Sequence, residues 1–352
     1  MNKNSAAGAV LGLAVGDALG TTYEFDVIDQ PAYPMLATGP ATDVVGAGPF
    51  LLAPGAVTDD TQLAVCVARS LVANRCELDL ADVSRRFLAW SDEAFDVGNQ
   101  TRAALQRLAD GEDPREAGRR VWRASGRTAA GNGSLMRAAS LAVAYAGRPR
   151  QARVEAAVAE SLITHADPRC ALACAAFVEA IATAVTGATR TGDLVDATVM
   201  SAAAADGSAR AAALLRAAWA SDADDLAAVA GAEVAIASDL AAAAALDPDL
   251  YGAELHIDRT AGFVRVAFRL AFWHLRQTPS WEAALVDVAS RGGDADTNAA
   301  ITGALVGARD GATAIPRAWR DRVLAATLPG SPTWAAAHHP RHLLALVDAS
   351  GD

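Results

Sequence analysis

The hydrophobic and polar positions follow a helical period along most of the chain from Thr58 onward. Alanine-rich apolar stretches alternate with short breaks of Gly, Pro or Asp, and segments of alternating β-branched residues are scarce. The pattern therefore predicts an all-α fold. The expected helical stretches are 61–73, 79–90, 100–109, 115–124, 135–145, 151–163, 169–185, 193–204, 209–219, 224–245, 261–276, 281–289 and 299–309.

The same pattern shows no division of the chain. We find no composition shift, no linker and no internal repeat of about 20 to 50 residues. Aromatic residues are only 5%, so a core of Ala, Leu and Val requires closely spaced helices. The expected organisation is a single compact multi-helix domain over residues 1–352, with the Pro-, Gly- and Thr-rich segment 26–54 as a long surface loop and a candidate lid.

The N-terminal segment reads as a buried helix. Lys3 followed by the apolar run Ala6–Val15 resembles a short signal peptide, but Asp17 interrupts the run. A glycine occupies every fourth position, so the glycines lie on one face of the helix. The backbone of another helix can approach this face closely. These glycines are Gly8, Gly12, Gly16 and Gly20. No apolar run reaches the roughly 18 residues that span a membrane, so no membrane partner is expected.

Composition limits which binding partners and which cellular compartment are expected. With 52% apolar and 20% charged residues the chain is globular. Its net charge of −11 and pI near 5.0 make nucleic acid an improbable partner, because backbone binding needs a basic surface. The four cysteines show no paired zinc spacing and are expected as reduced core thiols, which favours a cytoplasmic location. They are Cys66, Cys76, Cys170 and Cys174.

Two short acidic segments stand at the heads of apolar helical runs. Asp294, Asp296 and Thr297 follow two glycines, and Thr58-Asp59-Asp60-Thr61 repeats the combination of hydroxyl and carboxylates upstream. Each segment alone is typical of a helix start, where Thr caps the backbone and acids complement the dipole. Together, and with Glu24 as a fifth carboxylate, they offer the hard oxygen ligands that Mg²⁺ or Mn²⁺ prefers. Neither segment contains His or Cys, which argues against zinc and copper.

Other polar segments leave two interpretations open. The turn Gly131-Asn132-Gly133-Ser134 before a helix suits a phosphate, with Arg137 adding charge, or is a plain capped turn. Asp96 begins an acid–glycine–hydroxyl turn, and His165 lies between two helices, where a capping role is common. His338, His339 and His342 lack neighbouring acids and are expected on the surface.

Taken together, these segments resemble the ADP-ribosylglycohydrolase family, which includes the dinitrogenase reductase-activating glycohydrolases. The matching segments occur in the family's order and extend from residue 8 to about residue 319. They are Gly16-Asp17-Ala18-Leu19-Gly20 with Glu24, Thr58-Asp59-Asp60-Thr61, Asp96-x-Gly98-x-x-Thr101, Gly131-Asn132-Gly133-Ser134-x-Met136-Arg137, Thr164-His165 and Gly292-Gly293-Asp294-x-Asp296-Thr297.

The resemblance implies an all-α fold with two Mg²⁺ or Mn²⁺ ions in a cleft. Glu24, Asp96 and Asp60 are the implied catalytic acids, and Asp17 is expected to support the site or its packing. The implied metal ligands are Thr58, Asp59, Asp60, Asp294, Asp296 and Thr297. The implied substrate-binding residues are Gly131, Asn132, Gly133, Ser134, Met136, Arg137, His165 and Phe263, where the family often carries Tyr in place of Phe263.

The activity implied by the resemblance is metal-dependent hydrolysis of the bond between ADP-ribose and an acceptor, through an oxocarbenium-like state. Arginine-linked ADP-ribose on protein is the leading acceptor. A second hypothesis keeps the same site but changes the substrate or role: serine-linked or polymeric ADP-ribose, O-acetyl-ADP-ribose, a modified nucleic acid end, or immunity against a toxin. A third hypothesis is a non-catalytic relative that binds ADP-ribose. The expected partner is an ADP-ribosylated protein or a small ADP-ribose conjugate, and the chain is expected to act as a monomer.

Overall fold

The fold is all-α, as the sequence pattern predicted. The structure is a computed structural model that describes residues 1–187, 190–191 and 194–351. Its helical elements are α1 (Lys3–Gly20), η1 (Thr21–Tyr23), α2 (Asp59–Ala73), α3 (Leu80–Ser91), α4 (Asn99–Ala109), α5 (Ala117–Ala124), α6 (Ala138–Tyr145), α7 (Arg150–Leu162), α8 (Pro168–Thr186), α9 (Ala197–Ala218), α10 (Ala223–Ala242), α11 (Val264–Gln277), α12 (Trp281–Ser290), α13 (Ala295–Asp310), η2 (Ala312–Ala314), α14 (Arg317–Ala325), α15 (Pro332–Ala337) and α16 (Arg341–Ala349). Strands β1 (Arg190–Thr191) and β2 (Leu194–Val195) form one short antiparallel pair.

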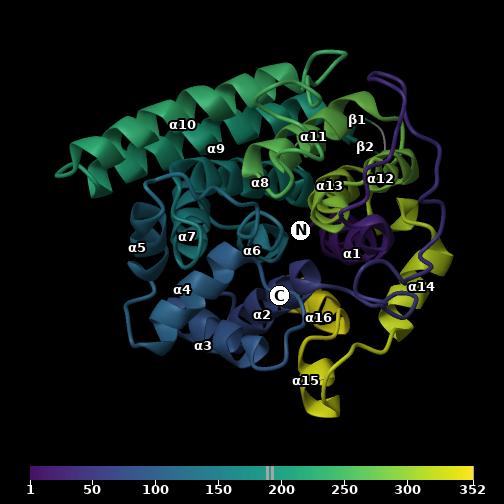
Figure 1. Cartoon of the computed structure of the whole chain (residues 1–352), viewed down its shortest axis with the longest axis horizontal. Coiled ribbons are helices and arrows are strands. Elements are labelled where there is room, and N and C mark those ends of the chain that lie inside the picture. The colour runs from purple at the N-terminus through teal and green to yellow at the C-terminus, as the bar shows by residue number, and fades with distance from the viewer. Residues whose placement is uncertain (188–189, 192–193, 352) are drawn as a thin grey trace.

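The glycine face of α1 packs directly on α13, and Figure 1 shows the two helices side by side. A Cβ atom at Gly12 would lie 2.1 Å from the carbonyl oxygen of Gly303, and one at Gly8 would lie 2.1 Å from that of Gly307. Such distances leave no room for any side chain. The prediction that this stripe admits another backbone is therefore confirmed. The contact joins the first helix of the chain to a helix far along the sequence.

Helix α8 forms the centre of the remaining bundle, in contact with α6, α7, α9 and α10. Among the described residues it is the one helix long and apolar enough to suit a membrane span, with a mean hydropathy of 1.5. Its residues face the interior instead, because 83% of that window is buried within the protein. A continuous cluster of buried apolar residues extends from α1 to α16.

The structure differs from the predicted helices in several places. Leu194 and Val195, expected in the helix 193–204, form strand β2. One uninterrupted helix, α9, replaces the two that were expected on either side of Gly207, although residue 193 of the expected range lies outside the described residues. Gly207 does not break the helix because its missing side chain lets α9 approach Glu179 and the Ala175 carbonyl of α8. Helices α14, α15 and α16 were not predicted.

The histidine cluster near the C-terminus corrects another expectation. His338 and His339 are buried, where the sequence suggested surface positions. The His338 ring packs against Trp334 of α15, and Trp334 in turn donates a hydrogen bond to the carbonyl of Trp90 at the end of α3. The C-terminal segment therefore packs onto α3 through Trp334, and this packing buries His338 and His339.

The long segment between η1 and α2 is irregular but firmly attached. Arg291 donates hydrogen bonds to the carbonyls of Pro31 and Met35, both at 3.0 Å, and its side chain is fully buried beside Asp287. Asp287 also accepts a hydrogen bond from the Ala37 N–H. These contacts fix residues 31–37 onto α12, so this part of the segment is a packed wall and not a free lid.

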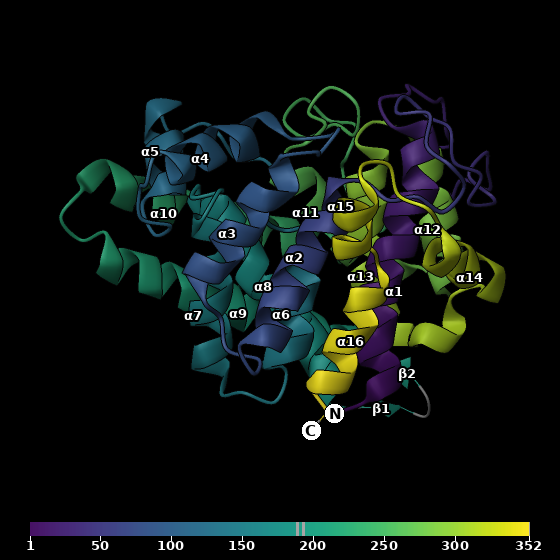
Figure 2. The same ribbon diagram turned by 90° about the horizontal axis from the view of Figure 1, so that it is seen from below.

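The loops gather at one end of the molecule. In Figure 2 the segment between η1 and α2 and the green segment between α10 and α11 lie together, opposite the end that carries both termini. Helix α13 begins near the loops and α1 ends there. A site built from helix starts and loops is consequently expected at this end.

Candidate active site

The site is built first from the start of α2. Thr58 occupies the position before the helix, yet its hydroxyl does not cap the helix backbone. The hydroxyl oxygen instead lies 2.9 Å from Asp17 Oδ1, 3.2 Å from Asp60 Oδ2 and 3.3 Å from Asp296 Oδ2. A hydroxyl carries one hydrogen and can donate to only one of these three carboxylates. The surroundings of Thr58 therefore hold more acceptors than donors.

The second half of the site is the turn before α13. Gly292 and Gly293 have φ angles of 71° and 67°, and a Cβ atom on either would lie within 2.5 Å of a backbone carbonyl oxygen. Their small size lets Gly293 exchange hydrogen bonds with Phe25 and Asp26. This pairing brings Glu24 to Asp296, whose N–H donates to Glu24 Oε2 at 3.2 Å.

Carboxylates converge between these two helix starts. Asp17, Asp60 and Asp296 each place an oxygen within 4.8 Å of the others, and Glu24, Asp294 and Asp296 form a second such group. All five acids are buried, and Asp60 Oδ1 has no hydrogen-bond partner among the described residues. Buried carboxylates in this number require a cation or protons. The two groups share Asp296, so the residues fit two neighbouring cations with oxygen ligands.

The acids strongly affect one another's protonation. Burial and the charges of Asp294 and other acids raise the pKa of Asp296 to about 8, although a hydrogen bond with Glu24 lowers it. Burial, followed by the charges of Asp296 and Asp294, raises the pKa of Glu24 far above its usual value. For Asp59 and Asp60 burial is again the largest cause of a raised pKa, and neighbouring carboxylates add to it.

Asp17 holds the start of α2 through hydrogen bonds. It is fully buried and accepts hydrogen bonds from the backbone N–H groups of Thr58 and Thr61, both at 3.1 Å, and from the Thr61 hydroxyl. Asp17 lies on α1, so these bonds attach the start of α2 to the end of the glycine helix. The structure is consistent with the supporting position expected from the sequence.

A cavity of about 370 Å³ opens over the carboxylates. Most of the acids proposed from the sequence line it, whereas Asp60 and Thr58 lie beneath the surface. Asp96, at the turn before α4, lies on this cavity, and burial together with the charges of Asp17 and Asp294 raises its pKa to about 6. The lining residues are Glu24, Phe25, Asp59, Asp96, Gly98, Asn99, Gln100, Thr101, Gly131, Asn132, Gly133, Met136, His165, Ala261, Gly262, Asp294, Asp296 and Thr297.

The glycine turn before α6 forms the opposite wall. Asn132 donates a hydrogen bond from Nδ2 to Asp294 Oδ2, which ties the turn to the acidic cluster. A Cβ atom at Gly133 would lie 2.8 Å from the His165 ring, so only glycine permits this contact. The backbone N–H groups of Gly133 and Ser134 donate to no acceptor within the described part of the chain. Free N–H groups of this kind suit an anion.

His165 has a defined tautomer. Arg137 donates from Nη2 to the Thr164 hydroxyl at 2.9 Å, and that hydroxyl lies 2.8 Å from His165 Nδ1. A guanidinium can only donate, so the hydroxyl accepts from Arg137. Among the described residues His165 Nδ1 is the one acceptor within reach of the hydroxyl's own hydrogen, so we infer that the hydroxyl donates to Nδ1. Burial and the charge of Arg137 hold the pKa of His165 well below its ordinary value. The neutral ring therefore carries its hydrogen on Nε2, at the cavity.

Three residues expected at the substrate lie away from the cavity surface. Arg137 is fully buried, with its Nε bonded to Glu160 at 2.6 Å, and so it has no charge to offer a diphosphate. The Ser134 side chain is fully buried against Ser161 and Cys174. Phe263 pairs with Gly131 through the backbone and lies under the Arg169 guanidinium. These positions indicate roles in holding the turn.

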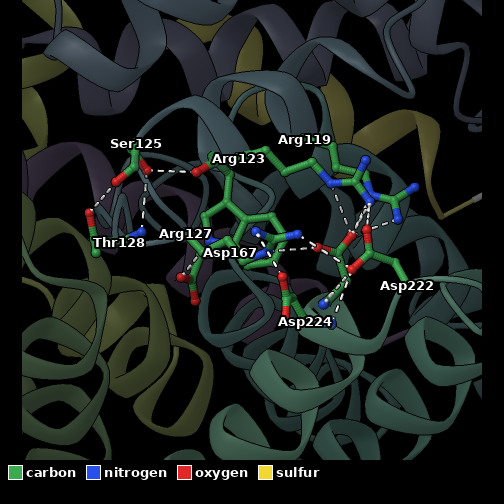
Figure 3. A network of polar contacts seen from close by, with 10 residues as sticks. Arg119, Arg123, Ser125, Arg127, Thr128, Asp167, Asp222 and Asp224 are labelled. Carbon is green, nitrogen blue, oxygen red and sulfur yellow. Dashed lines mark hydrogen bonds and ion pairs between the residues drawn. The ribbon is translucent and has the colours of Figure 1, made fainter.

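An arginine network anchors the elements that carry this wall. Figure 3 shows Arg119, Arg123 and Arg127 directed toward the aspartates at the start of α10. All three bond to Asp225, whose pKa burial alone would raise but whose hydrogen bonds with the arginines lower it overall. The neighbouring Trp122 donates to Asp167, which follows His165 by two residues. Helix α5 thus connects α10 to the His165 side of the cavity.

Two of the lining residues that sequence reasoning missed are Gln100 and Phe25. Gln100 accepts a hydrogen bond from the Gly131 N–H at 3.1 Å and so holds the glycine turn, although the segment from Asp96 to Thr101 gave only its acid as a candidate. Phe25, next to Glu24, lines the cavity with 66% of its surface exposed. The one sequence signal for Phe25 was its position next to Glu24, since its exposure is known only from the structure.

The chain is similar to several known proteins. An ADP-ribosylarginine hydrolase from Serratia proteamaculans is 27% identical over 91% of this chain and 75% of its own length. The ADP-ribosyl-[dinitrogen reductase] glycohydrolase of Rhodospirillum rubrum is 38% identical over 48% of this chain and 54% of its own length. A solved structure of an ADP-ribosylglycohydrolase-related protein complex superposes with a TM-score of 0.65 and 26% identity, covering 99% of this chain and 98% of the other.

A family model extends the comparison to nearly every residue. The model described as ADP-ribosylglycohydrolase matches residues 2–348. The match spans both acidic helix starts, the glycine turn and His165. The chain therefore belongs to the ADP-ribosylglycohydrolase family.

Proposed function

We propose that this protein is a metal-dependent hydrolase that removes ADP-ribose from arginine-linked acceptors on protein. The observation that supports it most strongly is the convergence of the α2 and α13 starts on Asp296, beside a glycine turn with free N–H groups. The names of the similar proteins point to the same linkage: two are called ADP-ribosylarginine hydrolases.

Two Mg²⁺ or Mn²⁺ ions fit the carboxylates. We assign the metal contacts to Asp59, Asp60, Asp294, Asp296, Thr58 and Thr297. Bound ions would neutralise the cluster and polarise the ribose hydroxyls and a water molecule. Glu24 lies at the edge of the cluster, where it is either a further ligand or a proton acceptor. The oxygen-only ligand set favours these hard cations.

The substrate then spans the cavity from the acids to the glycine turn. The free N–H group of Gly133, which lines the cavity, suits the diphosphate. The Nε2–H of His165 donates to the distal ribose or the adenine, and Met136 offers apolar contact from the lining. The scissile ribose consequently lies over Asp96 and Glu24.

Hydrolysis breaks the bond between ribose C1 and the guanidine nitrogen and forms a bond between C1 and the oxygen of water. The positive charge that develops on the sugar is stabilised by the surrounding carboxylates. Asp96, which lies on the cavity, accepts a proton from the attacking water and passes it to the departing nitrogen. The products are ADP-ribose and the unmodified arginine.

Serine-linked or polymeric ADP-ribose and O-acetyl-ADP-ribose are the alternative substrates, since they would place the same ribose in the same cavity. We also propose that residues 1–352 form one domain that acts as a monomer. The continuous cluster of buried apolar residues supports the single domain. Four free thiols, three of them buried, support a reducing cytoplasmic compartment.

The test replaces Asp60 with Asn in the full chain. With Mg²⁺ present, release of ADP-ribose from arginine-modified protein should fall by about a hundredfold or more, because a buried ligand charge is lost. The rise in Tm on adding Mg²⁺ should disappear as well. Asp321→Asn, an exposed acid on α14, is the matched control and should keep both properties. Full metal-dependent activity in Asp60→Asn would refute the proposal.

A further inference from the structure

Large apolar side chains stand exposed at the mouth of the cavity. The rings of Phe25 and Phe50 are 6.4 Å apart, and those of Phe50 and Phe95 are 5.4 Å apart, which forms a continuous aromatic wall. Phe25 is 66% exposed and Phe95 37%. Leu51, next to Phe50, is 85% exposed. Apolar groups gathered at one rim in this way are typical of a binding surface.

The backbone holds two of these residues in unfavourable conformations. Phe25 has a φ of 64° and Leu51 a φ of 53°, a region that residues with side chains seldom occupy. Phe25 is fixed by its bond to the Gly293 carbonyl, and the turn that carries Leu51 rests on η1 through Gly48, whose Cβ atom would lie 2.1 Å from the Thr21 carbonyl. Both backbones are therefore held so that the apolar side chains face solvent.

Two residues of the wall are sequence neighbours of the acids proposed to act at the reacting bond. Phe25 follows Glu24, and Phe95 precedes Asp96. Phe25 itself lines the cavity, so the wall continues the cavity surface outward. ADP-ribose occupies the side of the glycine turn in the proposed orientation. The acceptor must consequently leave the cavity along the wall.

We propose that the wall formed by Phe25, Phe50 and Phe95, with Leu51 beside it, docks the arginine-bearing segment of the modified protein. The cationic guanidinium lies between the acids of the cavity and the face of Phe25, where charge and aromatic ring both attract it. Apolar residues that flank the arginine contact Phe50 and Leu51. The wall thus selects arginines in apolar sequence surroundings. This inference rests on the proposed function, because it places the acceptor by the reacting bond.

The experiment uses the full chain with Mg²⁺ and three substrates: free ADP-ribosylarginine, and two peptides with a modified arginine flanked either by Leu and Val or by Asp. The variants are Phe50→Ser and Leu51→Ser, with Val234→Ser on α10, 72% exposed, as the control. We expect the KM for the apolar-flanked peptide to rise about fivefold in Leu51→Ser and more in Phe50→Ser. The KM for free ADP-ribosylarginine stays unchanged, and Val234→Ser behaves as the native chain.

Equal KM values for the two peptides on the native chain, or equal effects of Leu51→Ser on all three substrates, would overturn the docking proposal. Release of ADP-ribose from none of the three substrates would instead refute the proposed function. In that case the peptides remain intact, and their Kd values on the native chain and on Leu51→Ser test docking directly. A preference for the apolar-flanked peptide that Leu51→Ser removes supports the wall, and no preference overturns it.

Discussion

At the scale of single residues, a relay from a buried charge sets the state of His165. Arg137 cannot reach the substrate, but it donates to the Thr164 hydroxyl, and His165 Nδ1 is the one acceptor within reach of that hydroxyl's own hydrogen among the described residues. Burial, with the guanidinium charge added to it, holds the pKa of His165 well below its ordinary value, so the ring is neutral. Arg137, which the sequence suggested as a phosphate ligand, is therefore a positioning residue that acts through Thr164 and His165.

Replacing Thr164 with Val should disturb this relay at nearly constant volume. Arg137 loses an acceptor and His165 loses the bond that fixes its tautomer, so the Kd for ADP-ribose should rise about five- to tenfold and stability should fall by about 1–3 kcal/mol. Calorimetric titration and urea unfolding measure the two effects.

Thr302→Val provides the matched control for that substitution. The Thr302 hydroxyl on α13 is buried and has no hydrogen-bond partner among the described residues. Removing it should leave the affinity unchanged and should not lower stability. An unchanged Kd in Thr164→Val would show that the relay does not position His165.

At the scale of elements, the contact of α1 with α13 positions both halves of the acidic cluster. Asp17 lies on α1 and holds the start of α2, while Asp296 lies in the first turn of α13. A Cβ atom at Gly16 would lie 2.2 Å from the Ala299 carbonyl, and one at Gly20 would lie 2.2 Å from that of Ala295. The glycine face therefore continues up to the cluster and fixes the separation of the two helices there.

Gly12→Ala should force α1 and α13 apart, because its Cβ atom would lie 2.1 Å from the Gly303 carbonyl oxygen. We expect a loss of about 3 kcal/mol or more, or no folded protein, since two rigid backbones must move. Thermal and urea unfolding measure it. Gly231→Ala on α10 meets no atom within 4 Å and should instead stabilise by about 0.5–1 kcal/mol. Similar stabilities for the two variants would contradict this account of the contact.

At the scale of the whole molecule, the terminal segment makes stability depend on pH. Burial lowers the pKa of His338 to about 4, although a bond to the Trp334 carbonyl raises it in part. The unfolded chain binds a proton at this residue near pH 6.5, whereas the folded chain does so only near pH 4. The contribution of neutral His338 to the free energy of unfolding is therefore fully present above pH 6.5, and it is lost as the pH falls to about 4.

A comparison with His338→Gln isolates this contribution from the titration of the carboxylates. Between pH 7 and pH 4 the native chain should lose about 2 kcal/mol more free energy of unfolding than the variant. Urea unfolding at several pH values measures the difference. Parallel stability curves for the two proteins would mean that His338 gains its proton equally well in the folded state.

The sequence by itself determined the helical class, the glycine face of α1 and the two acidic segments at helix starts. Helical period, four-residue glycine spacing and the residue types at helix ends are local properties, so local pattern is sufficient to read them. It did not give the continuity of α9 across Gly207, because there the packing of α9 on Glu179 outweighs the low helix propensity of glycine.

Only the tertiary structure decided which polar residues face the cavity. Arg137 and Glu160, or Trp334 and Trp90, meet through contacts between different elements, and spacing along the chain carries no information about them. The same holds for the aromatic wall, since Phe25 and Phe50 lie far apart on the segment between η1 and α2, and Phe95 lies between α3 and α4. Burial and charge proximity are properties of the folded chain, and they turn candidate residues into a site.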